Sequence, residues 1–270
     1  MNKATIDVLI STMGDGINRV YSQRHPIQSR VRYILVHQVT PDYSNSSEIS
    51  KWLEGREDII YLPFIEKGLS NSRNRALDAA SAEIVMFCDD DVCYLPSAYK
   101  IVRNTLNQRE IDIATFKVQT PEGEGLKNYS EHSYQHNWRS VLKVSSIEVA
   151  AKRESIKNIR FDTYFGLGTA LPASEENIFL LDCLKQGLKL QYVPSFINLH
   201  PKESSGRDWS NQAMRSSKLT FFYRCFGLKA IPLFLVFAIK KRSEYQASIG
   251  IADFISENIS RLIERRKDVG

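Results

Sequence analysis

The sequence predicts an α/β protein in which helices flank a mostly parallel central sheet, followed by a helical C-terminal appendage. Short apolar runs alternate with helical stretches through about residue 120, the pattern of successive strand, helix and strand units. With 270 residues, 43% of them hydrophobic, the chain can bury a substantial core, which argues against a disordered scaffold. We expect the α/β domain to cover residues 1–207 and the appendage 208–270.

Five segments before residue 120 are predicted to be strands. Each is a short, largely apolar run bounded by turn-forming or polar residues, as expected of strands buried on both faces. They are Ile6–Ser11, Tyr33–Val39, Ile59–Leu62, Ile84–Cys88 and Ile111–Val118.

Two helices are predicted around the fourth strand. In the segment 68–80, Ser70 is a candidate N-cap, and Ala76, Leu77 and Ala80 form the apolar face. The second helix is Ser97–Leu106.

The middle of the chain, about 120–170, has no clean period and is interpreted as loops with some added strand. A helix is then expected at Ser174–Gln186, with Ser174 as its cap and Gly187 just past its end. The strand Leu188–Val193 follows.

The appendage contains a ten-residue apolar run, Ala230–Ile239, which by itself is too short to span a bilayer. Basic residues flank it, at Lys229 and at 240–242. Two interpretations are equally favoured: segment 229–267 contacts a membrane surface, or it packs on the α/β domain. The final helix has an apolar face formed by Ile251, Ile255, Ile259 and Leu262.

The net charge of +5 is concentrated in the appendage. Residues 201–270 hold 13 Lys and Arg against 7 Asp and Glu, or +6, which leaves −1 for the rest. The neighbour is expected to be an anionic surface, either membrane headgroups or phosphorylated substrates, and no nucleic acid. Four cysteines without paired spacing are expected to be free thiols. The first residues lack a secretory leader pattern, so a cytoplasmic location is expected, at the inner face of the cell membrane if the appendage binds it.

Three adjacent carboxylates, Asp89, Asp90 and Asp91, directly follow the predicted strand Ile84–Cys88. Their mutual repulsion is costly unless a cation or hydrogen-bond donors compensate. Ligands bind outside the carboxyl ends of parallel strands, and oxygen ligands suit Mg²⁺ or Mn²⁺. The alternative is an acidic turn that caps the helix near Ser97.

The segment from Gly68 to Ala76, GLSNSRNRA, followed by a helix, a strand and the aspartates, resembles the nucleotide-sugar half of family 2 glycosyltransferases of the GT-A fold. The resemblance covers roughly residues 5–205 and is most specific at 68–92. It implies a donor half at about 1–120 and an acceptor half at about 121–207. It also implies a metal site at Asp89 and Asp91, with Asp90 between them on the donor side.

The resemblance further implies that Arg73 faces the donor and that Thr12 lines the nucleotide, although a turn role for Thr12 is nearly as well supported. Where the family commonly has an acidic pair that reads the base, this chain has His37 and Gln38. These side chains could hydrogen-bond a base edge, or His37 could be a buried histidine at the end of a strand.

On the acceptor side, the resemblance assigns the catalytic base to the acidic pair Glu175 and Glu176, with Glu176 favoured. A sugar hydroxyl is a weak nucleophile, so a carboxylate must accept its proton. The alternative is that both glutamates only stabilise the first turn of their helix.

Past the next strand, His200 resembles a late metal or diphosphate ligand, and a plain surface loop is the alternative. Lys202, Ser204 and Ser205 could form a mobile lid over phosphates.

The expected activity is therefore inverting, metal-dependent transfer of a hexose from a nucleotide sugar, with UDP-sugar favoured, to a saccharide or lipid-linked saccharide in capsule, O-antigen or exopolysaccharide synthesis. One alternative is a nucleotidyltransferase, although segment 13–19 resembles the phosphate-binding loop of such an enzyme only weakly. The other is a non-catalytic nucleotide-sugar-binding protein.

Overall fold

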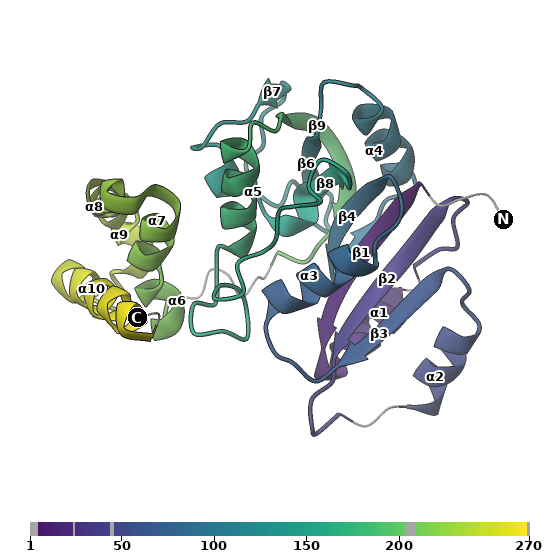
Figure 1. Ribbon diagram of the computed structural model, residues 1–270, viewed down its shortest axis with the longest axis horizontal. Coiled ribbons are helices and arrows are strands. Elements are labelled where there is room, and N and C mark those ends of the chain that lie inside the picture. The colour runs from purple at the N-terminus through teal and green to yellow at the C-terminus, as the bar shows by residue number, and fades with distance from the viewer. Residues whose placement is uncertain (1–4, 24, 44–45, 203–208, 269–270) are drawn as a thin grey trace.

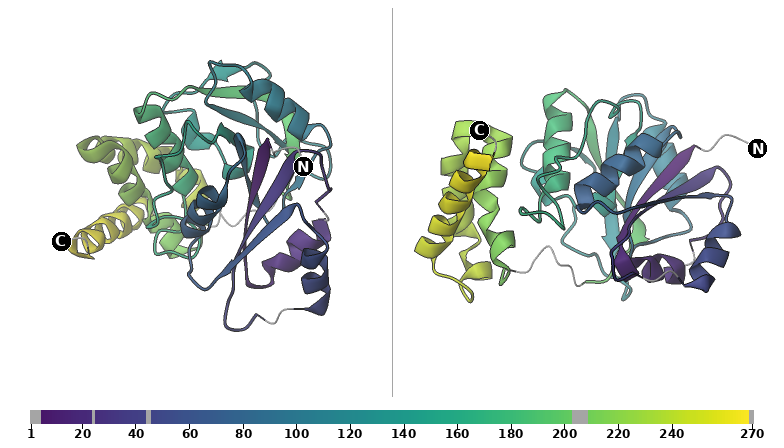
Figure 2. Two further views of the ribbon diagram at one scale, coloured as in Figure 1. Left: turned by 45° about the vertical axis from the view of Figure 1, so that its right-hand side comes forward. Right: turned by 60° about the horizontal axis from the view of Figure 1, so that its bottom comes forward.

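The computed structural model describes residues 5–23, 25–43, 46–202 and 209–268. One mixed sheet with helices on both faces forms the larger part, and a group of helices lies at one end of it (Figures 1 and 2). This arrangement confirms the predicted fold class. The expected boundary at residues 207 and 208 lies outside the described residues.

The sheet has nine strands in the order β3-β2-β1-β4-β8-β6-β9-β5, with β7 paired to β9. The first four strands of this order are parallel, β8 is antiparallel to both β4 and β6, and β6 is parallel to β9. The strands are β1 Ile6–Met13, β2 Val31–Gln38, β3 Ile59–Phe64, β4 Ile84–Asp89, β5 Cys93–Tyr94, β6 Ile113–Gln119, β7 Tyr134–Gln135, β8 Val149–Lys152 and β9 Leu190–Leu199.

All predicted strands and helices are present, and the structure adds β5, β7, β8, the two helices α1 and α2 of the sheet domain, and the four helices α6 to α9 of the appendage. The described α-helices are α1 Ile17–Gln23, α2 Ser47–Glu54, α3 Leu69–Ala79, α4 Ala98–Leu106, α5 Glu175–Lys185, α6 Gln212–Ser216, α7 Lys218–Phe226, α8 Ala230–Lys240, α9 Arg242–Tyr245 and α10 Ile251–Asp268.

Two hydrophobic cores cover the two faces of the sheet, because successive side chains of a strand point to opposite sides. In β1, Leu9 belongs to the core formed with α3 and α5, and its neighbours Val8 and Ile10 belong to the core formed with α1, α2 and α4. Both cores are closed around strands that are apolar on both faces.

One of the predicted helix caps is wrong, and a second is present without the expected hydrogen bond. The residue before α3 is Gly68, with φ 115°, and the Ser70 hydroxyl instead donates to the carbonyl oxygen of Phe165 at 2.6 Å. Ser174 does precede α5, but in a left-handed conformation and without a side-chain capping hydrogen bond. Gly187 follows α5 with φ 81°, as predicted for the end of that helix.

The appendage is joined to the sheet domain by ion pairs and a hydrogen bond. Arg224 of α7 pairs with Asp162 at 2.7 Å and with Asp182 of α5 at 2.8 Å. Arg261 of α10 donates to the carbonyl oxygen of Ala170 at 2.7 Å. The part of the appendage that carries these residues therefore packs on the sheet domain.

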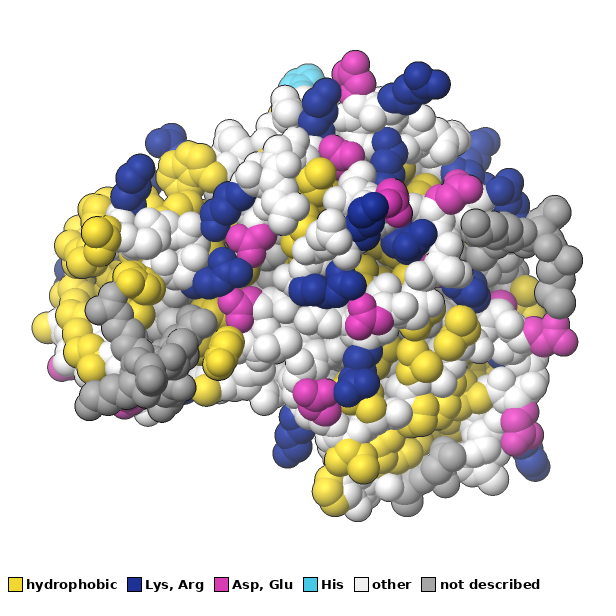
Figure 3. Space-filling view, viewed as in Figure 1, with side chains coloured by type: hydrophobic (Ala, Val, Ile, Leu, Met, Phe, Trp, Pro, Cys, Tyr) yellow, Lys and Arg dark blue, Asp and Glu magenta, His cyan; other side chains and the backbone are white. Residues whose placement is uncertain are grey.

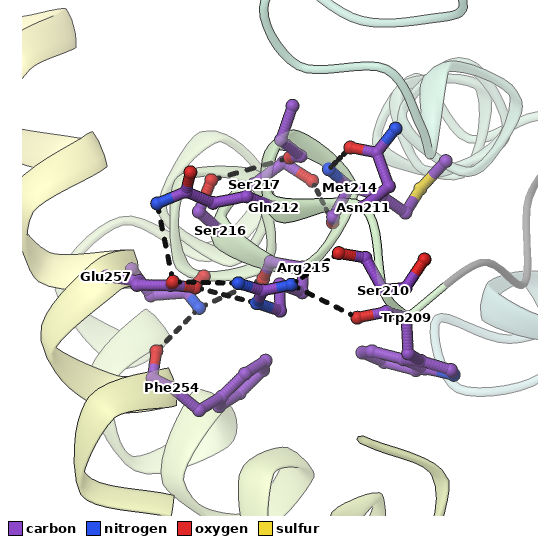
Figure 4. Close-up of polar contacts among 12 residues, drawn as sticks. Trp209, Ser210, Asn211, Gln212, Met214, Arg215, Ser216, Ser217, Phe254 and Glu257 are labelled. Atoms are coloured by element: carbon purple, nitrogen blue, oxygen red, sulfur yellow. Dashed lines mark hydrogen bonds and ion pairs between the residues drawn. The ribbon is translucent and has the colours of Figure 1, made fainter. Parts of the chain in front are cut away.

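Within the appendage, α6 is tied to α10 by a two-pronged contact between Arg215 and Glu257, with distances of 2.9 and 3.0 Å. Figure 4 shows the same guanidinium reaching the carbonyl oxygens of Trp209 and Ser210. The planar guanidinium thus joins the first residues of the appendage to its last helix.

Among the described residues, one helical stretch, 212–240, is long and apolar enough to cross a membrane by length and composition, and 28% of its 18-residue apolar window is buried. The predicted ten-residue run is the last part of this stretch. Core helices can pass the same test, so this is weak evidence for a membrane span.

Candidate active site

A cavity of about 660 Å³ opens at the carboxyl ends of β1, β2 and β4, where the sheet topology places ligands. It brings together side chains from both halves of the sheet domain and one from the appendage. Its polar lining includes Ser11, Thr12, Arg19, Gln38, Arg73, Asp89, Asp90, Asp91, Ser146, Glu175, Glu176, Asn177, His200, Lys202 and Lys218.

Asp90 is held by protein donors. Its carboxylate accepts from the Thr12 hydroxyl at 2.9 Å and from the Arg19 guanidinium at 2.9 and 3.0 Å. A methyl group at Gly16 would lie 2.3 Å from Oδ2 of Asp90, so the loop after β1 closes tightly on this carboxylate. Thr12 and Asp90 therefore support the cavity wall, and because both also line the cavity, their expected contacts with the donor stay a prediction.

Asp91 lies beside His200 at the end of β9, with Oδ1 of Asp91 3.3 Å from Nε2 of His200. The contact lacks hydrogen-bond geometry, and Oδ1 of Asp91 is buried without a hydrogen-bond partner among the described residues. Burial opposes the charge of His200, but the adjacent Asp91 carboxylate raises the pKa of the imidazole above its usual value. Two residues more than a hundred positions apart thus face each other, as a shared ligand site requires.

Arg73 of α3 connects the aspartate cluster at the end of β4 with the glutamate pair at the start of α5. Its guanidinium donates to Glu175 at 2.7 Å, to Asp89 at 3.0 Å and to the Ser146 hydroxyl at 2.7 Å. The side chain is 2% exposed but lines the cavity, so the expectation that it faces the donor stays a prediction. Such a paired, hydrogen-bonded cation holds two carboxylates in place.

Glu176 differs from its neighbour Glu175. Both glutamates line the cavity. Glu175 forms an ion pair with Arg73, whereas Glu176 forms no ion pair among the described residues. Burial and the negative charge of Glu175 raise the pKa of Glu176 well above the usual glutamate value, although Arg73 opposes this shift. A carboxylate of raised pKa facing a cavity is a candidate proton acceptor.

His37 does not face the cavity. It is completely buried, with Nε2 2.9 Å from the carbonyl oxygen of Gly14 and Nδ1 2.9 Å from the hydroxyl of Tyr61. Since a carbonyl only accepts, Nε2 carries the proton and Nδ1 accepts from Tyr61. The expected contact of His37 with a nucleotide base is therefore wrong, and the buried strand-end interpretation is correct. Gln38 does line the cavity, and its Oε1 has no partner among the described residues.

Two basic residues complete the lining. Lys202 is exposed at the rim, whereas Ser204 and Ser205, the other predicted lid residues, lie outside the described residues. Lys218, which sequence reasoning missed, enters from α7 in the appendage. No local motif marks Lys218, because its position depends on how the appendage packs. Arg19, also missed, lies in the segment 13–19 that faintly resembles a phosphate-binding loop.

The mixed sheet curled around an acidic cluster, with flanking helices, is the GT-A fold of nucleotide-sugar enzymes. The chain belongs to glycosyl transferase family 2, whose sequence model matches residues 12–168, more than half of its length. No curated protein matches the chain.

Several solved structures are similar to this one. They include S. aureus TarS 1-349 in complex with UDP-GlcNAc, with a TM-score of 0.62 and 13% identity over 96% of this chain and 82% of that one. The complex with UDP has a TM-score of 0.62 and 13% identity, with 88% and 72% covered. For TarS 1-349 alone the TM-score is 0.61 at 13% identity, with 82% of this chain and 65% of that chain covered. The chain thus spans about two thirds of that structure, and the likeness shows the fold.

Proposed function

We propose that this protein is an inverting glycosyltransferase that moves a hexose from a nucleotide sugar to a hydroxyl group of a saccharide or lipid-linked saccharide. One observation carries the proposal: a single cavity holds the unpaired, half-buried carboxylate of Glu176 together with the facing pair Asp91 and His200. The crystallised TarS complexes contain UDP and UDP-GlcNAc, which supports a UDP-sugar as donor.

A divalent cation, Mn²⁺ or Mg²⁺, fits the residues present. The buried Oδ1 of Asp91 lacks a hydrogen-bond donor among the described residues and has His200 beside it, and Asp89 is partly exposed to the same cavity. Among the described residues no three His, Cys, Asp or Glu side chains form a ready metal site. We propose that Asp91, His200 and Asp89 would hold the cation only together with donor phosphates, which would complete the shell, as Mg²⁺ sites commonly require. When bound, the cation neutralises charge on the departing nucleoside diphosphate.

The remaining chemistry belongs to Glu176. The acceptor oxygen forms a bond to the anomeric carbon while the bond from that carbon to the diphosphate breaks, and the hydroxyl proton passes to the Glu176 carboxylate. A single displacement of this kind inverts the configuration of the sugar. Arg73 keeps Glu175 and Asp89 in place, so that Glu176 is the carboxylate left to accept the proton.

A panel of nucleotide sugars tests this proposal directly. With Mn²⁺ present, we expect release of nucleoside diphosphate from one donor, with a UDP-sugar favoured, and no release in the presence of a chelator. Chromatography of the nucleotide products measures the outcome. Calorimetric donor binding that needs Mn²⁺, without nucleotide release under any acceptor, would instead identify a non-catalytic nucleotide-sugar-binding protein.

A lipid-linked acceptor is supported by the outer face of the appendage, where hydrophobic side chains gather (Figure 3). On α8, Ile231, Leu235 and Ile239 recur at every fourth residue and are 41–67% exposed. Exposed basic residues, among them Lys229 and Lys240, lie at the two ends of this face. We propose that this surface rests on an anionic membrane, which fits a role in capsule, O-antigen or exopolysaccharide synthesis.

Vesicle flotation tests the membrane contact. We expect wild type to float with vesicles that contain phosphatidylglycerol and the triple variant Lys240→Ala, Lys241→Ala, Arg242→Ala to float much less, because each basic residue near an anionic surface contributes about 1 kcal/mol. A matched control removes three exposed basic residues from the sheet domain, at Lys51, Lys100 and Arg109, and should float as wild type does. Equal flotation of all proteins, or none from any, contradicts the membrane proposal.

A further inference from the structure

Lys218 is the only described residue of the appendage that lines the cavity. It is the first residue of α7, and the charges that act most on its ammonium group are those of Glu176 and Glu175. The charges of Asp89, Asp90 and Asp91 are not among them. Lys218 therefore lies on the side of the cavity where the proposed base stands.

The ammonium group of Lys218 has no carboxylate within ion-pair distance among the described residues. Its contacts are the sulfur of Met214 at 3.7 Å and the ring of Trp209, whose centroid is 5.7 Å away. Burial lowers the pKa of Lys218 to about 8, although Glu176 and Glu175 oppose the shift. Lys218 is half-buried, and a cation that loses solvent without gaining a partner is costly; a cation in the first turn of a helix also opposes the helix dipole. Folding alone gives no reason to place a lysine here.

The two guanidinium groups that line the cavity already form ion pairs with carboxylates. Arg19 is bound to Asp90, and Arg73 is shared between Asp89 and Glu175. An ammonium group offers three hydrogen-bond donors, which Lys218 has not spent on carboxylates of the described chain. Lys218 is therefore available to an anionic ligand.

The position of Lys218 is built into the fold by a break between α6 and α7. The Asn258 amide of α10 spans this break: its Oδ1 accepts from the backbone N–H of Leu219 at 2.9 Å, and its Nδ2 donates to the carbonyl oxygen of Arg215 at 3.0 Å. Asn258 is completely buried, so the N–H of Leu219 and the carbonyl group of Arg215 both depend on its amide for a hydrogen-bond partner. The ion pairs of Arg224 then hold α7 against the sheet domain.

We infer that Lys218 binds an oxyanion, a phosphate or a carboxylate, that is part of the acceptor molecule and lies close to the hydroxyl group that Glu176 deprotonates. This inference rests on the proposed function, because only a transferase has an acceptor molecule. The five carboxylates that line the cavity would repel an anionic acceptor, and Lys218 offsets that repulsion next to the reacting hydroxyl. The substrate class is thus an anionic saccharide or a phosphate-bearing acceptor, with a neutral sugar disfavoured.

Binding of small probes to the full chain tests the inference. Glycerol 3-phosphate and glucuronate stand for the two oxyanions, glycerol and glucose are their neutral counterparts, and titrations are followed by calorimetry with UDP and Mn²⁺ present. Wild type should bind one oxyanion in preference to its neutral counterpart. Lys218→Met should weaken that binding by about tenfold or more, as loss of a charge-assisted hydrogen bond does. Which oxyanion binds identifies the acceptor group.

Three controls separate loss of the Lys218 charge from other causes of weakened oxyanion binding. Lys229→Met removes an exposed lysine of the same helical stretch and should bind the oxyanion as wild type does. Lys218→Arg keeps the charge and should recover part of the binding. Thermal unfolding of Lys218→Met should show no loss of stability, since a half-buried cation without a carboxylate partner is removed.

Equal oxyanion binding by wild type and Lys218→Met would overturn the inference. It would also be overturned if Lys218→Met lost affinity for UDP as strongly as for the oxyanion, since Lys218 would then serve the donor. If no nucleotide sugar is turned over but oxyanion binding still depends on Lys218, the proposed transfer fails while the anion site stands.

Discussion

Replacing Glu176 by glutamine is expected to abolish sugar transfer and to leave donor binding intact. The amide keeps the shape of the side chain but cannot accept the proton of the attacking hydroxyl, and loss of a general base costs about 10²- to 10⁴-fold in rate. Glu176 has no ion pair among the described residues, so the substitution leaves no buried cation without its partner. Product formation measures the rate, and calorimetry with UDP and Mn²⁺ measures binding.

The pH profile of the wild-type enzyme sharpens this expectation. Burial and Glu175 raise the pKa of Glu176, so the ionised, proton-accepting form is lost as pH falls through a midpoint above the ordinary glutamate value of about 4.3. The transfer rate should therefore rise with pH through that midpoint, and the residual rate of Glu176→Gln should lack this step. As a control, Glu264→Gln changes an exposed glutamate of α10 and should keep both rate and profile. Transfer by Glu176→Gln at the wild-type rate would remove Glu176 from the mechanism.

The second large effect is expected for Asp91→Ala, which should abolish metal-dependent binding of the donor. The substitution removes the buried Oδ1 that faces His200, and loss of even an outer-shell partner of a metal site costs about 10- to 100-fold in affinity. Titration of UDP with Mn²⁺, and again with a chelator, measures the metal-dependent part of binding. In wild type the two titrations should differ greatly, and in Asp91→Ala they should coincide.

Asp90→Asn is the matched control, because it changes the neighbouring carboxylate of the same cluster. Asp90 is bound to Thr12 and Arg19, so its replacement should lower the thermal stability of the loop after β1 while UDP binding remains dependent on Mn²⁺. If Asp91→Ala keeps the metal dependence and Asp90→Asn loses it, the two assignments are exchanged. If UDP binding depends on Mn²⁺ neither in wild type nor in the variants, the proposed cation site in the acidic cluster is wrong.

The strands and the main helices of the sheet domain were predictable because their signals are local. An apolar run bounded by polar residues indicates a strand, and each of the five predicted before residue 120 is present. The region 120–170 was harder, because β8 is a four-residue strand whose place between β4 and β6 is decided by pairing with both neighbours. The prediction for Ser70 failed because its hydroxyl has a partner in a distant loop, at Phe165.

The sequence by itself determined the α/β class, the acidic cluster at the end of β4 and the glutamate pair at the start of α5, since each depends on residues adjacent in the chain. Only the tertiary structure decided which of those groups remains available. Arg73 reaches Glu175 across 102 positions and leaves Glu176 as the carboxylate without an ion pair in the described chain. The packing of α7 brings Lys218 to the same cavity. Charge pairing and burial act between side chains that meet in space, and no local pattern records which side chains meet.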